Sequence, residues 1–134
     1  RTKCATLPCV DYTTTLAHEY INDKYPLLLQ KYASSIAATT FHANIKYWEI
    51  PAAGCLTFME VTEKNNAKRT GFIDNKTCVY INESNYVEKF NEFLKTRDNP
   101  KWEKIASDGR KFALENFNND VAVNSLVDLI KELI

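Results

Sequence analysis

One stretch of this sequence decides the fold: KYWEIPAAG at residues 46–54, followed at once by the apolar run at residues 55–61. A second apolar run, residues 35–40, comes before it. Both runs have strand length, and the segment between them has the character of a short helix that ends at a glycine. The order strand, loop, helix, strand indicates parallel pairing with a right-handed crossover. Loops at the carboxyl ends of parallel strands face a ligand crevice, so we expect Glu49 to lie where a carboxylate can bind sugar hydroxyls.

Pro51 limits where the helix in this stretch can begin. A proline in a helix interior removes a backbone donor and clashes with the carbonyl four residues back, at a cost of about 3 kcal/mol, whereas the first turn tolerates it. We therefore expect the helix to begin near Glu49, with residues 44–48 as an irregular or single-turn approach. Glu49 then lies at the helix N-terminus, where the helix dipole favours a carboxylate.

Strand and helix signals also alternate outside this stretch. Residues 77–81 are β-branched and aromatic, as in a third strand, and the polar residues 62–76 are expected to form a surface loop. A short strand candidate lies within residues 1–11. Helical spacing or a helix cap marks five more segments, at about 16–22, 26–33, 84–96, 100–117 and 121–134. The sequence thus predicts an α/β fold, a Rossmann-like parallel sheet flanked by helices, with a helical C-terminal third that packs across the sheet.

Length and composition bound the fold and the partners. With 134 residues, 45% hydrophobic and 25% charged, we expect residues 1–134 to form a single domain. The 17 basic and 17 acidic residues cancel, so no nucleic-acid partner is indicated. No apolar run approaches the ~20 residues of a membrane span. The chain begins with neither a signal-peptide pattern nor a Met, so we expect a cytoplasmic protein, and a fragment of a longer chain is an open alternative.

The cysteine spacing gives little support for a metal site. Cys4 and Cys9 are five positions apart, Cys55 and Cys78 stand alone in apolar runs, and no pair has the Cys-x-x-Cys spacing of a zinc site. Free cysteine in an apolar run behaves as a small buried hydrophobe. We expect four reduced thiols and no metal, with a Cys4–Cys9 disulfide as the alternative.

An ordered series of segments resembles a known family. The series consists of residues 46–54, the strand after them, the turn at 71–74, the strand at 77–81, and the helix that carries WEKIASDGR at 102–110. In this order, and over roughly residues 30–125, the chain resembles the C-terminal, donor-binding half of GT-B fold glycosyltransferases of the group 1 type, especially the group related to spore-maturation CgeB proteins. The resemblance implies one half of a GT-B fold that binds a nucleotide-diphosphate sugar, with no metal or other cofactor, and that works with an N-terminal acceptor-binding domain that this chain does not contain.

The resemblance also implies roles for particular residues. A glutamate at the position of Glu49 contacts the donor ribose in that family, and a carboxylate can accept two hydrogen bonds from vicinal hydroxyls. Lys46 resembles a basic residue that faces phosphate. The small run that ends at Gly54 would let backbone amides approach the diphosphate, which a helix N-terminus also attracts. Phe41 stands where many retaining members carry a second acidic residue, so the stereochemistry of transfer stays open.

Three further binding candidates follow from chain position. His42 and Asn44 come after the strand at 35–40, and Glu60 ends the strand at 55–61, which places all three on the expected ligand edge. An imidazole with a pKa near 6.5 can donate to phosphate, as can a carboxamide. Each has a plain structural alternative: a surface histidine, a helix-capping asparagine, and a strand-ending glutamate.

Alternatives remain for the helix residues and for the function. Glu49 can instead cap the helix or pair with Lys46, and Trp48 can pack at the rim of the core instead of stacking on a base. A non-catalytic Rossmann-like module that binds a ligand or a protein is the second functional hypothesis, since Phe41 replaces an acid. A flavodoxin-like or response-regulator fold needs a phosphate loop or an acidic pair on the first strand, and there the sequence offers only Asp11.

Overall fold

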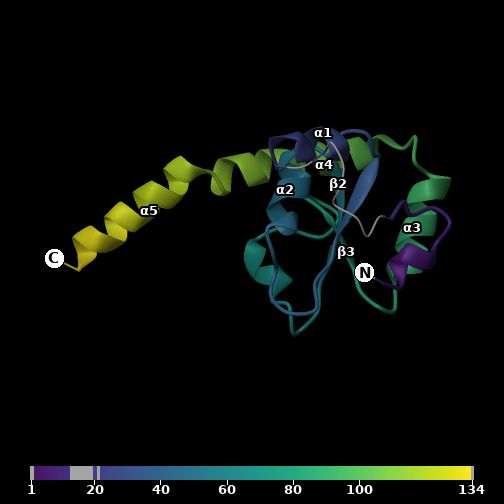
Figure 1. The fold of residues 1–134 in the computed structure, drawn as a ribbon, viewed down its shortest axis with the longest axis horizontal. Helices are drawn as coiled ribbons and strands as arrows, with labels where there is room; N and C mark the ends of the chain where they lie inside the picture. The colour runs from purple at the N-terminus through teal and green to yellow at the C-terminus, as the bar shows by residue number, and fades with distance from the viewer. Residues whose placement is uncertain (1, 13–19, 21, 134) are drawn as a thin grey trace.

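A parallel sheet lies at the centre of the fold in the computed structural model, which describes residues 2–12, 20 and 22–133 (Figure 1). Within these residues the strands are β1 (Ser34–Ala37), β2 (Leu56–Glu60) and β3 (Val79–Ile81), in that spatial order. Both pairings are parallel, and Phe58 of β2 lies opposite Ile36 on one side and Val79 on the other. The predicted α/β class and parallel sheet are therefore confirmed.

Helices make up most of the remaining described residues. They are α1 (Tyr25–Leu29), α2 (Lys46–Ala52), α3 (Tyr86–Lys95), α4 (Pro100–Asn116) and α5 (Asn119–Glu132), with short 3-10 turns η1 (Cys4–Thr6), η2 (Asn22–Lys24) and η3 (Ala67–Thr70). The predicted helical C-terminal third is confirmed, but the expectation that it packs across the sheet is wrong for α5, none of whose residues is buried. The helix expected at 16–22 lies mostly outside the described residues.

The prediction of a strand within residues 1–11 is wrong. Residues 4–6 form η1, in which the Leu7 amide donates to the Cys4 carbonyl at 3.1 Å and the Thr6 hydroxyl donates to the Lys3 carbonyl at 2.8 Å. These local bonds use the backbone groups that a strand would need for its neighbour, because Ser and Thr side chains compete for nearby backbone partners.

The central strand β2 is buried on both faces and divides the core into two clusters. Leu56 and Phe58 face a cluster that includes Phe90 of α3, whereas Cys55 and Met59 face a cluster that includes residues of α1 and α2. Side chains alternate between the faces of a strand, so an almost continuous apolar run is what a strand covered on both sides requires. Helices therefore cover the two faces of the sheet, as the sequence predicts.

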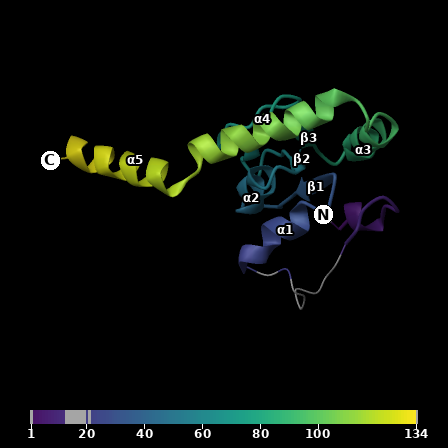
Figure 2. The same cartoon turned by 90° about the horizontal axis from the view of Figure 1, so that it is seen from above.

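Helix α4 crosses the sheet at the amino ends of its strands. Figure 2 shows α4 lying along the sheet. Its first half contributes Trp102 and Ile105 to the α3-side cluster, and Ala113 belongs to the α2-side cluster. Between them, Gly109 packs so tightly that a Cβ there would lie 2.2 Å from the Thr77 carbonyl oxygen, just before β3. This contact needs a residue without a side chain and leaves the carboxyl edge of the sheet free of α4.

The expected start of α2 is wrong. The helix begins at Lys46 and not near Glu49. Its N-cap residue is Ile45, which makes no side-chain cap bond, and the Lys46 amide donates instead to the Asn44 side-chain oxygen at 3.1 Å. Pro51 lies in the last turn of a seven-residue helix. Because proline has no N–H, the Tyr47 carbonyl is the one backbone group of the helix that loses its donor. Glu49 therefore lies in the middle of α2, and Gly54 lies past its C-terminal end.

Helix α5 extends away from the rest of the chain (Figures 1 and 2). None of its residues is buried, although it carries a row of large apolar side chains, Val123, Leu126, Val127, Leu129, Ile130 and Leu133. Asn118 caps its first turn by accepting from the Val121 amide at 2.9 Å, so a local cap and helical spacing define this helix without tertiary packing.

Candidate functional site

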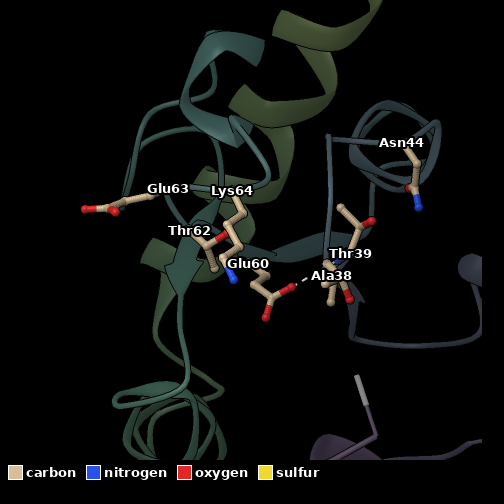
Figure 3. Close-up of a pocket in the computed structure, with 8 residues that line it drawn as sticks. Ala38, Thr39, Asn44, Glu60, Thr62, Glu63 and Lys64 are labelled. Atoms are coloured by element: carbon tan, nitrogen blue, oxygen red, sulfur yellow. Dashed lines mark hydrogen bonds between the residues drawn. The ribbon is translucent and has the colours of Figure 1, made fainter.

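A pocket of about 650 Å³ lies at the carboxyl ends of β1 and β2 (Figure 3). We call it the strand-end pocket. Its lining consists of short polar and charged side chains with one alanine: Ala38, Thr39, Thr40, Asn44, Glu60, Thr62, Glu63 and Lys64. This is the edge at which open parallel sheets bind ligands, because the connecting loops diverge there.

Glu60 joins the two strand ends. It is the last residue of β2, and its carboxylate accepts a hydrogen bond from the Thr39 backbone amide at 3.0 Å, just beyond the end of β1. No other partner of the carboxylate exists among the described residues, so its second oxygen is available to a ligand. A half-buried carboxylate fixed through one oxygen can accept from a ligand hydroxyl through the other.

A buried carboxamide shapes the wall of the strand-end pocket. Asn65 is fully buried; its side-chain oxygen accepts from the Thr62 and Ala67 amides at 3.1 and 3.0 Å, and its amide group donates to the Glu60 carbonyl at 2.9 Å and to the Tyr47 hydroxyl at 3.2 Å. The Tyr47 hydroxyl in turn donates to the Glu60 carbonyl at 2.9 Å. Asn65 therefore fixes the loop after β2 to α2.

The backbone of Asn65 extends this network to the opposite wall. Its carbonyl accepts from the Ala43 amide at 2.9 Å, and its backbone amide donates to the Thr62 hydroxyl oxygen at 3.1 Å. Burial, and secondarily the charge of Glu60, raises the pKa of the Tyr47 hydroxyl far above its usual range, so this hydroxyl stays protonated as a donor. The two walls are thus held together by hydrogen bonds that need no ligand.

Two of the six predicted binding residues, Asn44 and Glu60, line the strand-end pocket. The Asn44 side-chain oxygen also accepts from the Lys46 amide in the first turn of α2, whose N-cap residue is Ile45. The Asn44 amide group has no partner within the described part of the chain. His42 is exposed in the same loop with a φ of +52° and does not line the pocket.

Lys46 and Glu49 lie on α2 outside the pocket lining. The Lys46 ammonium donates to the Tyr25 hydroxyl at 3.2 Å and lies 5.0 Å from the centre of that ring. Glu49 is half-buried, and its carboxylate has neither a hydrogen bond nor an ion pair with any described residue. The alternative of a Lys46–Glu49 ion pair is therefore not formed, and the Glu49 carboxylate remains unpaired.

Gly54 lies at the far edge of the sheet from the strand-end pocket. It follows α2 with a φ of +83°, and its amide donates to the Pro51 carbonyl at 2.8 Å. The prediction that the helix ends at this glycine is confirmed, since α2 ends at Ala52 and Ala53 is its C-cap. A helix C-terminus presents carbonyl groups, which do not attract a diphosphate.

Sequence reasoning missed Asn65 and treated Lys64 as part of a solvated loop. One signal was present: Thr62 and Asn65 are three positions apart, the spacing at which each side chain can bond the other's backbone amide. Trp48 packs at the rim of the core, with its ring 5.7 Å from that of Phe117 in an edge contact, as its alternative reading predicts.

The described residues contain neither a group of three His, Cys, Asp or Glu side chains placed to hold a metal ion nor a helix long and apolar enough to cross a membrane. The four cysteines are free thiols, of which Cys9 is exposed, so the alternative Cys4–Cys9 disulfide is not formed. No family model matches the chain, and the comparisons with curated proteins and with solved structures found no match either. Function is therefore argued from the fold and the strand-end pocket.

Proposed function

We propose that this chain is the nucleotide-sugar-binding half of a GT-B glycosyltransferase, acting in the cytoplasm with an acceptor-binding domain supplied N-terminally or by another chain. The reaction is glycosyl transfer from a nucleotide-diphosphate sugar to an acceptor. The observation that carries the proposal is the strand-end pocket, a polar cavity at the ligand edge of a parallel sheet with the Glu60 carboxylate at its centre.

The lining suits a ligand that is rich in hydroxyl and phosphate oxygens. Carboxylates accept from sugar hydroxyls, and hydroxyl, amide and ammonium groups donate to phosphate. Glu60 supplies the acceptor within the pocket, while Glu49, half-buried and unpaired among the described residues, is the proposed ribose contact from α2. Glycosyl transfer with a diphosphate leaving group requires donors that stabilise the departing charge, and no step of this proposal uses a metal.

Calorimetric titration with UDP, GDP and ADP tests this proposal. We expect at least one of them to bind with a dissociation constant below 1 mM. Replacing Glu49, the proposed ribose contact, by Gln keeps the shape and removes the charge, and should weaken binding by about 1.5–3 kcal/mol. Glu63→Gln is the matched control, because the Glu63 carboxylate points away from the centre of the pocket in Figure 3. Absence of heat with all three nucleotides at millimolar concentration would refute the proposal.

A second candidate is a non-catalytic Rossmann-like module that binds another protein. The exposed apolar row of α5 favours it, because an uncovered apolar helix face is typical of an interaction site. Sugar transfer by this chain, or by this chain together with an acceptor-binding domain, would exclude it.

A further inference from the structure

The strand-end pocket contains more unused donors than unused acceptors. Asn44 commits its side-chain oxygen to the Lys46 amide, which leaves its amide group free. The Thr62 oxygen accepts from the Asn65 amide, so its hydroxyl proton remains to be donated. Neither the Lys64 ammonium nor the Thr40 hydroxyl has a partner in the described part of the chain.

The acceptors are fewer and lie to one side. The Thr39 hydroxyl is used, since it donates to the Phe41 carbonyl at 3.1 Å. One Glu60 oxygen is bonded to the Thr39 amide, and the other is free. In Figure 3, the Lys64 side chain extends toward Glu60, whereas the Glu63 side chain extends away from both of them. A ligand that satisfies this set brings several acceptor oxygens and negative charge, together with a hydroxyl for Glu60, which is the chemistry of a sugar phosphate.

The same lining is unsuited to a nucleobase. None of the described residues that line it is aromatic, and among them only Ala38 is wholly apolar. Proteins usually hold a planar base against aromatic or apolar side chains, because its faces are apolar and its edges alone carry polar groups. The base is therefore expected outside the strand-end pocket.

The position of Lys64 is set by its neighbour. Asn65 is fully buried and bonded through both its backbone and its side chain, so the backbone that carries Lys64 is fixed at one end. At the other end, Thr62 is bonded to Asn65 through both its amide and its hydroxyl oxygen. A lysine held at the mouth of a polar pocket without a paired carboxylate presents a full charge to an anionic ligand. No ion pair joins it to a described residue, so no internal contact has to be broken.

We infer that the strand-end pocket holds the phosphate-bearing part of the nucleotide sugar, with Lys64 as the cation that faces the phosphate, and that the base lies outside it. This inference rests on the proposed function. It names a phosphate-binding residue in the loop after β2, whereas Lys46 on α2 donates to Tyr25 and lies outside the pocket lining.

The test compares nucleosides with nucleoside diphosphates on the full chain. The ligands are those nucleoside diphosphates that bind the unmodified protein, each with its parent nucleoside, and the variants are Lys64→Met and the matched control Lys68→Met. Lys68 is exposed on η3 and does not line the strand-end pocket. Lys64→Met should weaken binding of the diphosphate 10-fold or more and change the affinity for the nucleoside less than 2-fold. Added salt should lower the affinity for the diphosphate only when Lys64 is present. Lys68→Met should change neither ligand.

The outcomes separate this inference from the function on which it rests. If the unmodified protein binds no diphosphate at millimolar concentration, both fail. If it binds a diphosphate with an affinity that Lys64→Met does not change, or if this substitution weakens nucleoside and diphosphate binding equally, only the placement of the phosphate is overturned. Circular dichroism of the exposed-site variants checks that folding is unchanged.

Discussion

Among the residues of the loop after β2, Asn65 is expected to have the side chain that contributes most to the free energy of unfolding. Asn65→Ala removes four side-chain hydrogen bonds, two from the Thr62 and Ala67 amides and two to the Glu60 carbonyl and the Tyr47 hydroxyl. The Thr62 amide belongs to an exposed residue and can be hydrated, and the Glu60 carbonyl still accepts from Tyr47. The Ala67 amide is left in a buried segment, and a cavity replaces the carboxamide. At about 0.5–1.5 kcal/mol for each net bond, and 1–3 for a buried group left unpaired, the loss in unfolding free energy is about 3 kcal/mol.

Urea unfolding followed by far-ultraviolet circular dichroism measures this loss. Asn91→Ala is the control, because Asn91 is exposed on α3 and should change the unfolding free energy by less than about 0.5 kcal/mol. Asn65→Ala should also weaken nucleotide binding under conditions in which the variant is folded, since the loop that carries Lys64 is then less ordered. A loss below about 1 kcal/mol in the Asn65 variant would show that the network does not stabilise this loop, and the reasoning would be wrong.

Three further substitutions test other parts of the fold. Gly109→Ala should cost more than about 3 kcal/mol in chemical unfolding, because its Cβ would lie 2.2 Å from a backbone oxygen, whereas Ser107→Ala on the same helix should be neutral. Burial raises the pKa of the Cys55 thiol from 9.0 to about 11, so the native state holds this proton more tightly than the unfolded state does. That stabilisation is complete below pH 9 and should fall by about 3 kcal/mol as the pH rises through 11, a pH dependence that Cys55→Ala removes. Leu126→Ala on the exposed face of α5 should change stability by less than about 0.5 kcal/mol, against about 2–5 for Leu56→Ala in the core, and equal losses would mean that α5 packs on the domain.

The sheet could be predicted because its strands are defined by local composition. Residues 55–61 form a nearly unbroken apolar run, which only a strand covered on both faces requires, and β2 is such a strand. The start of α2 could not be predicted from the cost of a proline alone. That cost applies to a helix interior, and α2 is short enough for Pro51 to fall in its last turn, where one carbonyl loses its partner.

The site could be predicted where it depends on topology and not where it depends on loop conformation. Asn44 and Glu60 follow strand ends, and parallel strands bring their carboxyl ends to one edge, so both line the strand-end pocket. The end of the helix at Gly54 could be predicted from residue type, because glycine adopts the positive φ of +83° that follows α2, whereas the start of the helix was predicted three residues late. The position of Lys64 depends on the hydrogen bonds of Asn65 in the same loop, and a loop has no sequence periodicity from which such bonds could be predicted.

The two edges of the sheet have different roles, and this makes stability and binding separable. At the amino edge, Gly109 of α4 packs against the Thr77 carbonyl, and the Arg110 guanidinium donates to the Ala52 carbonyl at the end of α2 at 3.3 Å. These contacts hold α4 against the segment before β3 and the end of α2. Among the described residues, the carboxyl edge has the strand-end pocket, whose polar groups are only partly paired. Substitutions at the amino edge should therefore change unfolding free energy without changing nucleotide affinity, and those at the pocket should do the reverse. Asn65 is the exception that follows from the structure, because it is buried like a core residue and bonded to both walls of the pocket, so its loss should lower both quantities together.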